Sequence, residues 1–198
     1  MTEPAGEVLL YFLVPLWLAA GVADWFCHRA SHIETTTGVK ESLIHLLMFG
    51  EVGIALLAGI FLEINAGIIL LMIVVFLIHE ATALWDVSYA VTGRRVSPLE
   101  QHIHSFLELI PLMAILCVVV LHWQQFLSLV GMGSERADFT LGLKVQKLPT
   151  SYVAALFTAI MLFEFLPYME ELWRGMRVKA STRASAANAR PPVHETSR

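Results

Sequence analysis

Histidines and carboxylates recur through the apolar first half of this chain at spacings that suit a metal centre. Seven of the eight histidines lie within or beside apolar runs, and six of those seven fall between residues 28 and 104. An ionisable side chain inside a membrane is costly unless it is paired or bound, so by default it marks a functional site. Imidazole and carboxylate together form a ligand set for iron, zinc or manganese. The sequence therefore predicts a metal centre built from histidines and carboxylates.

The first apolar stretch carries Asp24, His28 and His32 at spacings of four residues. Residues four apart share one face of a helix, and two histidines so placed can bind one metal ion. We predict metal ligation for all three, with His28 as the strongest candidate. The alternative is that His32 lies at the membrane interface and Asp24 pairs with a neighbouring helix.

The second apolar stretch repeats the spacing with Glu41 and His45. Glu41 falls in the first turn of the expected helix, where a carboxylate is also stabilised by the helix dipole. We therefore predict His45 as the ligand. Glu51, deeper in the same helix, is either a ligand or a buried hydrogen-bond acceptor.

In the third stretch, His79 and Asp86 are two helical turns apart and so share a face. Glu80 points about 100° away from His79, so we favour His79 and Asp86 as ligands. Trp85 suits an interfacial position as well as the wall of a site.

In the fourth stretch, His104 and Glu108 have the four-residue spacing, and both are predicted ligands. His102 lies about 200° from His104 around a helix and cannot face the same point. Ser97-Pro98-Leu99-Glu100 fits a helix-capping box, which explains Glu100 without a metal. The predicted metal ligands are thus Asp24, His28, His32, His45, His79, Asp86, His104 and Glu108. No catalytic residue is assigned.

The elements that must position these residues are membrane helices. The chain is 57% apolar and only 15% charged, whereas soluble domains are nearer 25% charged. A membrane helix needs about 20 mostly apolar residues. Five stretches qualify: 8–32, 41–62, 66–90, 98–130 and 151–173. The predicted fold is an all-α, polytopic membrane helix bundle with about five transmembrane helices.

Residues 1–179 form this integral membrane domain, and residues 180–198, rich in Ala, Ser, Arg and Pro, are expected to be a disordered tail. Residues 174–198 carry six basic residues and the first and third loops carry two each, whereas the N-terminus and the second loop carry none and the 131–150 loop carries three. This asymmetry predicts an N-terminus outside and a C-terminus in the cytoplasm. The formal charge of −4 argues against a nucleic-acid partner. The two cysteines have no zinc-type spacing and are expected to be reduced core residues.

The motif His28-Arg29-Ala30-Ser31-His32, with histidines at the same depth in later helices, resembles the integral membrane fatty acid hydroxylase and desaturase superfamily. The resemblance implies a non-haem di-iron centre, a lipid-like or hydrophobic substrate in the bilayer and a separate electron donor. It carries over His28 and His32 directly. The chain has no HxxHH box, so carboxylates would replace several of the family's ligands. A closer likeness is to small uncharacterised bacterial membrane proteins, which implies the bacterial inner membrane.

The leading hypothesis is a membrane-embedded metalloprotein: a di-iron oxidoreductase, with zinc or manganese as alternative metals. The first alternative is a pathway for divalent metal or protons, which would need polar residues up to the outer face. The second is a b-type haem protein with two axial histidines. The third is a structural membrane subunit whose polar groups join its helices.

Overall fold

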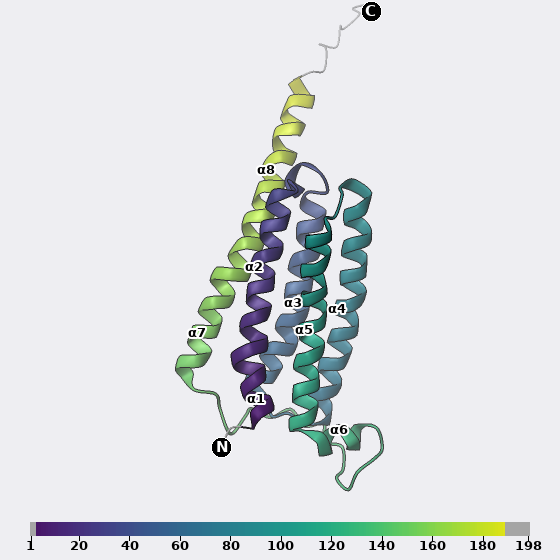
Figure 1. The fold of residues 1–198 in the computed structure, drawn as a ribbon, viewed down its shortest axis with the longest axis vertical. Coiled ribbons are helices and arrows are strands. Elements are labelled where there is room, and N and C mark those ends of the chain that lie inside the picture. Colours follow the sequence, from purple (N-terminus) through teal and green to yellow (C-terminus); the bar gives the residue numbers. More distant parts are fainter. Residues whose placement is uncertain (1–2, 189–198) are drawn as a thin grey trace, which may run out of the picture.

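The computed structural model describes residues 3–188, which form a bundle of long helices running up and down (Figure 1). The first rod combines α1 (Pro4–Val8), a π-helical turn η1 (Leu9–Leu13) and α2 (Val14–Ala30). The next three are α3 (Val39–Phe61), α4 (Ala66–Gly93) and α5 (Pro98–Leu121). The last combines α7 (Thr150–Ile160), a second π-helical turn η3 (Met161–Phe165) and α8 (Leu166–Asn188). A 3₁₀ turn η2 (Ile33–Thr35) and a short α6 (Trp123–Leu129) complete the elements.

The five rods close into a ring. Along this ring α2 packs on α5, α5 on α4, α4 on α3, and α3 on α8, which returns to α2. The short link between α3 and α4 makes them an antiparallel hairpin. A closed ring gives every rod an inward face, and this is where polar side chains from different helices can meet.

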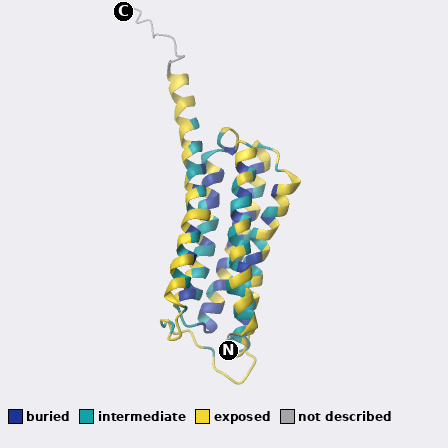
Figure 2. Ribbon diagram, turned by 60° about the vertical axis from the view of Figure 1, so that its left-hand side comes forward, coloured by how far each residue is buried: buried dark blue, intermediate teal, exposed yellow. Residues whose placement is uncertain are grey.

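The bundle buries many polar side chains and exposes a largely apolar outer surface. Five helices are long and apolar enough to cross a membrane. Each of these helices has both buried and exposed residues along its length (Figure 2). The exposed residues include many large apolar side chains, whereas many acidic side chains and histidines are buried. A water-soluble bundle would show the reverse, because burial of apolar surface is what stabilises it. The all-α, polytopic membrane fold predicted from the sequence is confirmed.

Local signals set the helix ends. Ser97 accepts from the Glu100 backbone N–H while the Glu100 side chain accepts from that of Ser97, so the predicted capping box starts α5. The Asn65 side chain accepts from Ile68 N and starts α4. Gly38 precedes α3 with a φ of 62°, a conformation that glycine adopts without a steric penalty.

Three of the differences from the predicted boundaries change where a histidine lies or how far a helix extends. The first rod ends at Ala30 rather than at 32, and His32 takes a left-handed conformation. The fourth helix ends at Leu121, and His122 separates it from α6. The last helix continues through Asn188, so the expected tail begins as helix, and residues 189–198 lie outside the described residues.

The loop between α6 and α7 folds against the opposite end of the bundle. Leu143 forms an isolated antiparallel bridge with Leu62, and Lys144 N donates to Phe61 O. The Lys144 ammonium reaches further in and donates to Gly59 O at 2.7 Å. Backbone hydrogen bonds and the Lys144 side chain therefore hold this loop against the ends of the helices.

Candidate metal centre

Buried polar side chains gather at the end of the bundle where α2 and α4 end and α3 and α5 begin. All of them are buried inside the ring. A histidine or carboxylate in such a place must be paired or bound. This polar cluster consists of Asp24, His28, Glu41, His45, Asp86, Glu100, His104 and Glu171.

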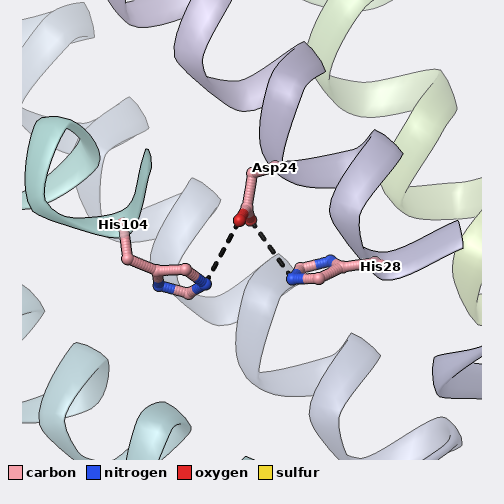
Figure 3. A group of neighbouring side chains, drawn as sticks. All are labelled: Asp24, His28 and His104. Atoms are coloured by element: carbon pink, nitrogen blue, oxygen red, sulfur yellow. Dashed lines mark ion pairs between the residues drawn. The ribbon is translucent and has the colours of Figure 1, made fainter. Parts of the chain in front are cut away.

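Asp24 lies between two histidines that come from different helices (Figure 3). Its Oδ1 is 3.2 Å from Nε2 of His104, and its Oδ2 is 3.4 Å from Nε2 of His28. One ligand atom from each of these three residues lies within 4.8 Å of the other two. Since bonds from a metal to nitrogen or oxygen are about 2.0–2.2 Å long, a small closure would let the three atoms share one ion.

A second group adjoins the first. His28, Glu41 and His45 also place ligand atoms within 4.8 Å of one another. Nε2 of His45 is 3.3 Å from Oδ1 of Asp86 and 4.0 Å from Oε1 of Glu41. The rings of His28 and His45 stack with centroids 4.4 Å apart and planes 10° apart. Because His28 belongs to both groups, the two candidate sites are immediate neighbours.

Glu171 fixes the orientation of two of the imidazoles. Its Oε2 is 2.8 Å from Nδ1 of His28, and its Oε1 is 2.9 Å from Nδ1 of His45. If each Nδ1–H donates to Glu171, each Nε2 keeps a free lone pair that faces the carboxylates on the other side. Metal-binding histidines use their second ring nitrogen in this way, and a carboxylate acceptor is one of the usual partners.

The inward-facing atoms fit a bound cation. Among the described residues, His28 Nε2, His45 Nε2, Asp24 Oδ1 and both carboxylate oxygens of Asp86 are buried and have no hydrogen-bond partner. Native structures pair nearly all of their buried polar atoms. An imidazole lone pair that faces a carboxylate oxygen is repelled unless a proton or a cation lies between them. The donor set therefore suits divalent metal ions placed among these atoms.

Arg94 borders the cluster from the link between α4 and α5. Its buried guanidinium donates to both Glu41 and Glu100. Burial alone would lower the Arg94 pKa, but its hydrogen bonds to Glu100 and Glu41 outweigh burial, and the pKa is raised above its usual value. Arg94 is therefore a permanent cation that holds two carboxylates together. Sequence reasoning counted Arg94 only as a basic loop residue and explained Glu100 by the capping box, although Glu100 also lies four residues before His104.

Formal charge also favours two ions. The cluster's five carboxylates and the Arg94 guanidinium leave four negative charges when the three histidines are neutral. Two divalent cations would balance them. Protonation of all three histidines would instead leave one uncompensated negative charge.

His79 forms a separate pair deeper in the bundle. Its Nδ1 is 3.5 Å from Oε2 of Glu51, and Oε1 of Glu51 accepts from the Thr82 hydroxyl at 2.8 Å. Glu51 thus acts as a buried acceptor. A cavity of about 40 Å³ joins this pair to the polar cluster, and its polar lining residues are Asp24, His45, His79, His104, Glu108 and Tyr168. His79 and Glu108 face this cavity but belong to neither candidate metal group.

His32 is not brought to the polar cluster. The helical face that carries Asp24 and His28 stops at Ala30, and the His32 side chain is 74% exposed, 3.5 Å from Glu34. The i, i+8 spacing holds only while the helix continues, which explains this correction. His102 is exposed, as its angle to His104 predicts, and His122 lies at the far end of α5.

Sequence reasoning missed Glu171. The last apolar stretch was expected to end at 173, and none of its carboxylates was predicted to be a metal ligand. A usable signal is present, because Glu164, Tyr168 and Glu171 follow one another at spacings of four and three residues, and all three are buried. Such spacing marks one helix face.

Comparison with protein-family models, with curated proteins and with solved structures gave no match. What the chain does is therefore inferred from its own residues. They form a helical membrane bundle with buried groups of histidine and carboxylate that could hold a metal ion.

Proposed function

We propose that this chain is a membrane-embedded metalloprotein whose polar cluster binds two divalent cations, iron in preference to zinc or manganese. One observation carries the proposal. Glu171 holds His28 and His45 so that each Nε2 faces carboxylate oxygens and, within residues 3–188, forms no hydrogen bond. Mixed imidazole and carboxylate ligands suit iron, whereas zinc sites built for structure favour cysteine.

We further propose that the centre serves a non-haem di-iron oxidoreductase acting on a lipid-like or hydrophobic substrate. Iron bound by such ligands with open positions supplies O₂ activation. Glu171 and Arg94 hold the ligand side chains in place, and the surrounding apolar helices exclude water from the site.

Hydroxylation of a C–H bond by O₂ places one oxygen atom in the product and reduces the other to water. That reduction takes two electrons and two protons from outside. The sequence has no nucleotide-binding glycine motif and no CxxCH haem motif. The electrons would therefore come from a separate donor protein at the membrane surface.

Two alternative functions fit the geometry less well. A metal or proton pathway needs polar groups across the membrane, but the interior beyond His79 is an apolar cavity. A haem needs a large pocket beside its axial histidines, but the cavity beside His45 and His104 is about 40 Å³. The polar cluster is thus suited to metal ions bound directly by side chains rather than to a haem.

Metal content tests the proposal. The wild-type protein and the variants His28→Ala, His104→Ala and His122→Ala are purified in parallel, and metal per protein and the optical spectrum are recorded. We expect about two ions per chain in the wild type, a large loss in the first two variants and none in His122→Ala, because His122 caps the far end of α5. Acidification should also release metal, since imidazole must be unprotonated to bind it.

The metalloprotein proposal would be overturned if the wild-type protein held no stoichiometric metal after reconstitution with Fe(II), Mn(II) or Zn(II). The cluster would then be a set of polar contacts that joins helices. A haem spectrum would instead replace the di-iron hypothesis.

A further inference from the structure

An apolar cavity of about 250 Å³ fills the half of the bundle opposite the polar cluster. The first rod, α3, α4, α5 and the loop before α7 all contribute to its wall. Most of the lining is aliphatic or aromatic, as at Leu56, Met72, Val75 and Ile115. Natural interiors are close-packed, so an apolar space of this size in a membrane protein calls for an occupant.

Polar groups stand at the two ends of this cavity. At the inner end is His79, which also lines the small cavity beside Asp24, His45 and His104. Trp17 and Val52 line both cavities as well. The apolar cavity therefore ends one side chain away from the candidate metal centre.

At the outer end, Lys144 and His122 line the cavity. The Lys144 ammonium has three N–H donors, of which one is used by Gly59 O. Burial lowers the Lys144 pKa, so an anionic partner would stabilise the charged amine. The nearby Glu63 carboxylate accepts from Val145 N and, within residues 3–188, forms no ion pair with Lys144 at 4.0 Å or less.

The cavity has the length of one acyl chain. Along α5 its lining runs from Ile110 to His122, which is about 18 Å at 1.5 Å per residue. The hydrocarbon core of a bilayer is about 30 Å thick, so one leaflet's chains reach roughly half of that. An extended single chain therefore matches the distance between the two polar ends.

We propose that this cavity binds a long single-chain amphiphile with an anionic head group, its head at Lys144 and the end of its chain beside His79. That the amphiphile is the substrate rests on the proposed function, because the end of the chain would then lie next to the metal centre. Binding itself needs no metal.

Photolabelling tests the placement. The probe is palmitic acid with a diazirine at the end of its chain, added to purified protein in nanodiscs and competed with unlabelled palmitic acid. We expect competable labelling at inner lining residues such as Val75 and Phe76. Labelling confined to lipid-facing side chains such as Leu77 and Ile78 would overturn the proposal.

Two pairs of variants sharpen the test. Ala114→Trp fills the cavity and should abolish competable labelling, whereas Leu116→Trp, on the lipid-facing side of the same helix at 54% exposure, should not. Lys144→Gln should weaken binding of the acid by about tenfold and leave the matching alcohol unaffected, as loss of one charge-assisted contact predicts. Lys147→Gln, an exposed lysine of the same loop, is the control. Equal effects of the two lysine changes would contradict the head-group assignment.

Metal content measured on the same samples separates the two proposals. Cavity labelling in protein that never takes up metal would support the binding site and refute the metalloenzyme. Stoichiometric metal without competable labelling would do the opposite.

Discussion

Glu171 links the fifth rod to the candidate metal centre through two hydrogen bonds. Both of its oxygens are engaged, one by each of His28 and His45. Each of the two carboxylate oxygens can accept from one ring N–H, whereas a carboxamide has one acceptor oxygen and a donor NH₂ group at its other end. Glutamate at position 171 therefore sets the tautomer and the orientation of both imidazole rings.

Replacing Glu171 with Gln should weaken metal binding about 10–100-fold, the usual effect of losing a partner behind a ligand. One of the two rings would lose its acceptor and turn, while the ligand atoms themselves stay present. Chelator competition on purified protein measures the affinity. Glu170→Gln is the matched control, because the Glu170 carboxylate contacts Trp25 and Arg29 outside the cluster. An unchanged affinity in Glu171→Gln would show that the rings are positioned by something else.

Spacing in the sequence found five of the residues that helices carry inward, but it set aside Glu41 and Glu100, which reach the polar cluster as well. Asp24, His28, His45, Asp86 and His104 all reach the polar cluster. Spacing wrongly placed His32 in this cluster, because the end of a helix cannot be predicted to within two residues from composition. It could not find the role of Arg94 or Glu171, since their partners lie on other elements and only the closed ring brings them together.

The first and last rods each contain a π-helical turn. They contact each other where the turn of the last rod, η3, packs on α2. Glu164, in η3, is buried against Gly21 of α2, where a Cβ atom would lie within 2.5 Å of the carboxylate. The π turn holds one extra residue and so shifts which side chains face inward. Glycine at 21 is what lets Glu164 enter the interface.

Gly21→Ala should therefore destabilise the bundle by about 1–3 kcal/mol, the usual cost of overpacking an interior. Truncating the opposing side chain removes the clash, so Gly21→Ala combined with Glu164→Ala should recover most of the loss. Thermal unfolding in detergent measures both. Gly53→Ala is the control, because an added Cβ there meets no neighbouring atom. If the double variant is no more stable than Gly21→Ala alone, the two residues are not coupled.

The whole molecule divides into two halves with different chemistry. One half holds the polar cluster and Arg94, and the other holds the apolar cavity and the loop of Lys144. The hydropathy pattern predicts the number of spans and their hairpin order, since each span is a local property of the chain. It cannot predict the cavity, which is the space left between all five rods and the loop before α7.

The end of the bundle that holds the polar cluster should face the cytoplasm. Arg29, Lys40, Arg94 and Arg95 lie at this end, and the basic residues of α8 extend beyond it (Figure 1). Positive residues are retained on the cytoplasmic side. Of the three basic residues in the opposite loop, Lys144 is directed into the bundle and bonded to Gly59 O, which weakens its effect as a free loop charge.

Fusions in a bacterial host test this orientation. A reporter that is active only in the periplasm should be inactive when fused after Ala187 and active when inserted in the loop at Gly142. One span lies between these two positions, so they are on opposite sides of the membrane. A reporter that fluoresces only in the cytoplasm should give the reverse pattern. Periplasmic activity after Ala187 would invert the molecule, placing the metal centre near the outer face and the mouth of the cavity near the cytoplasm.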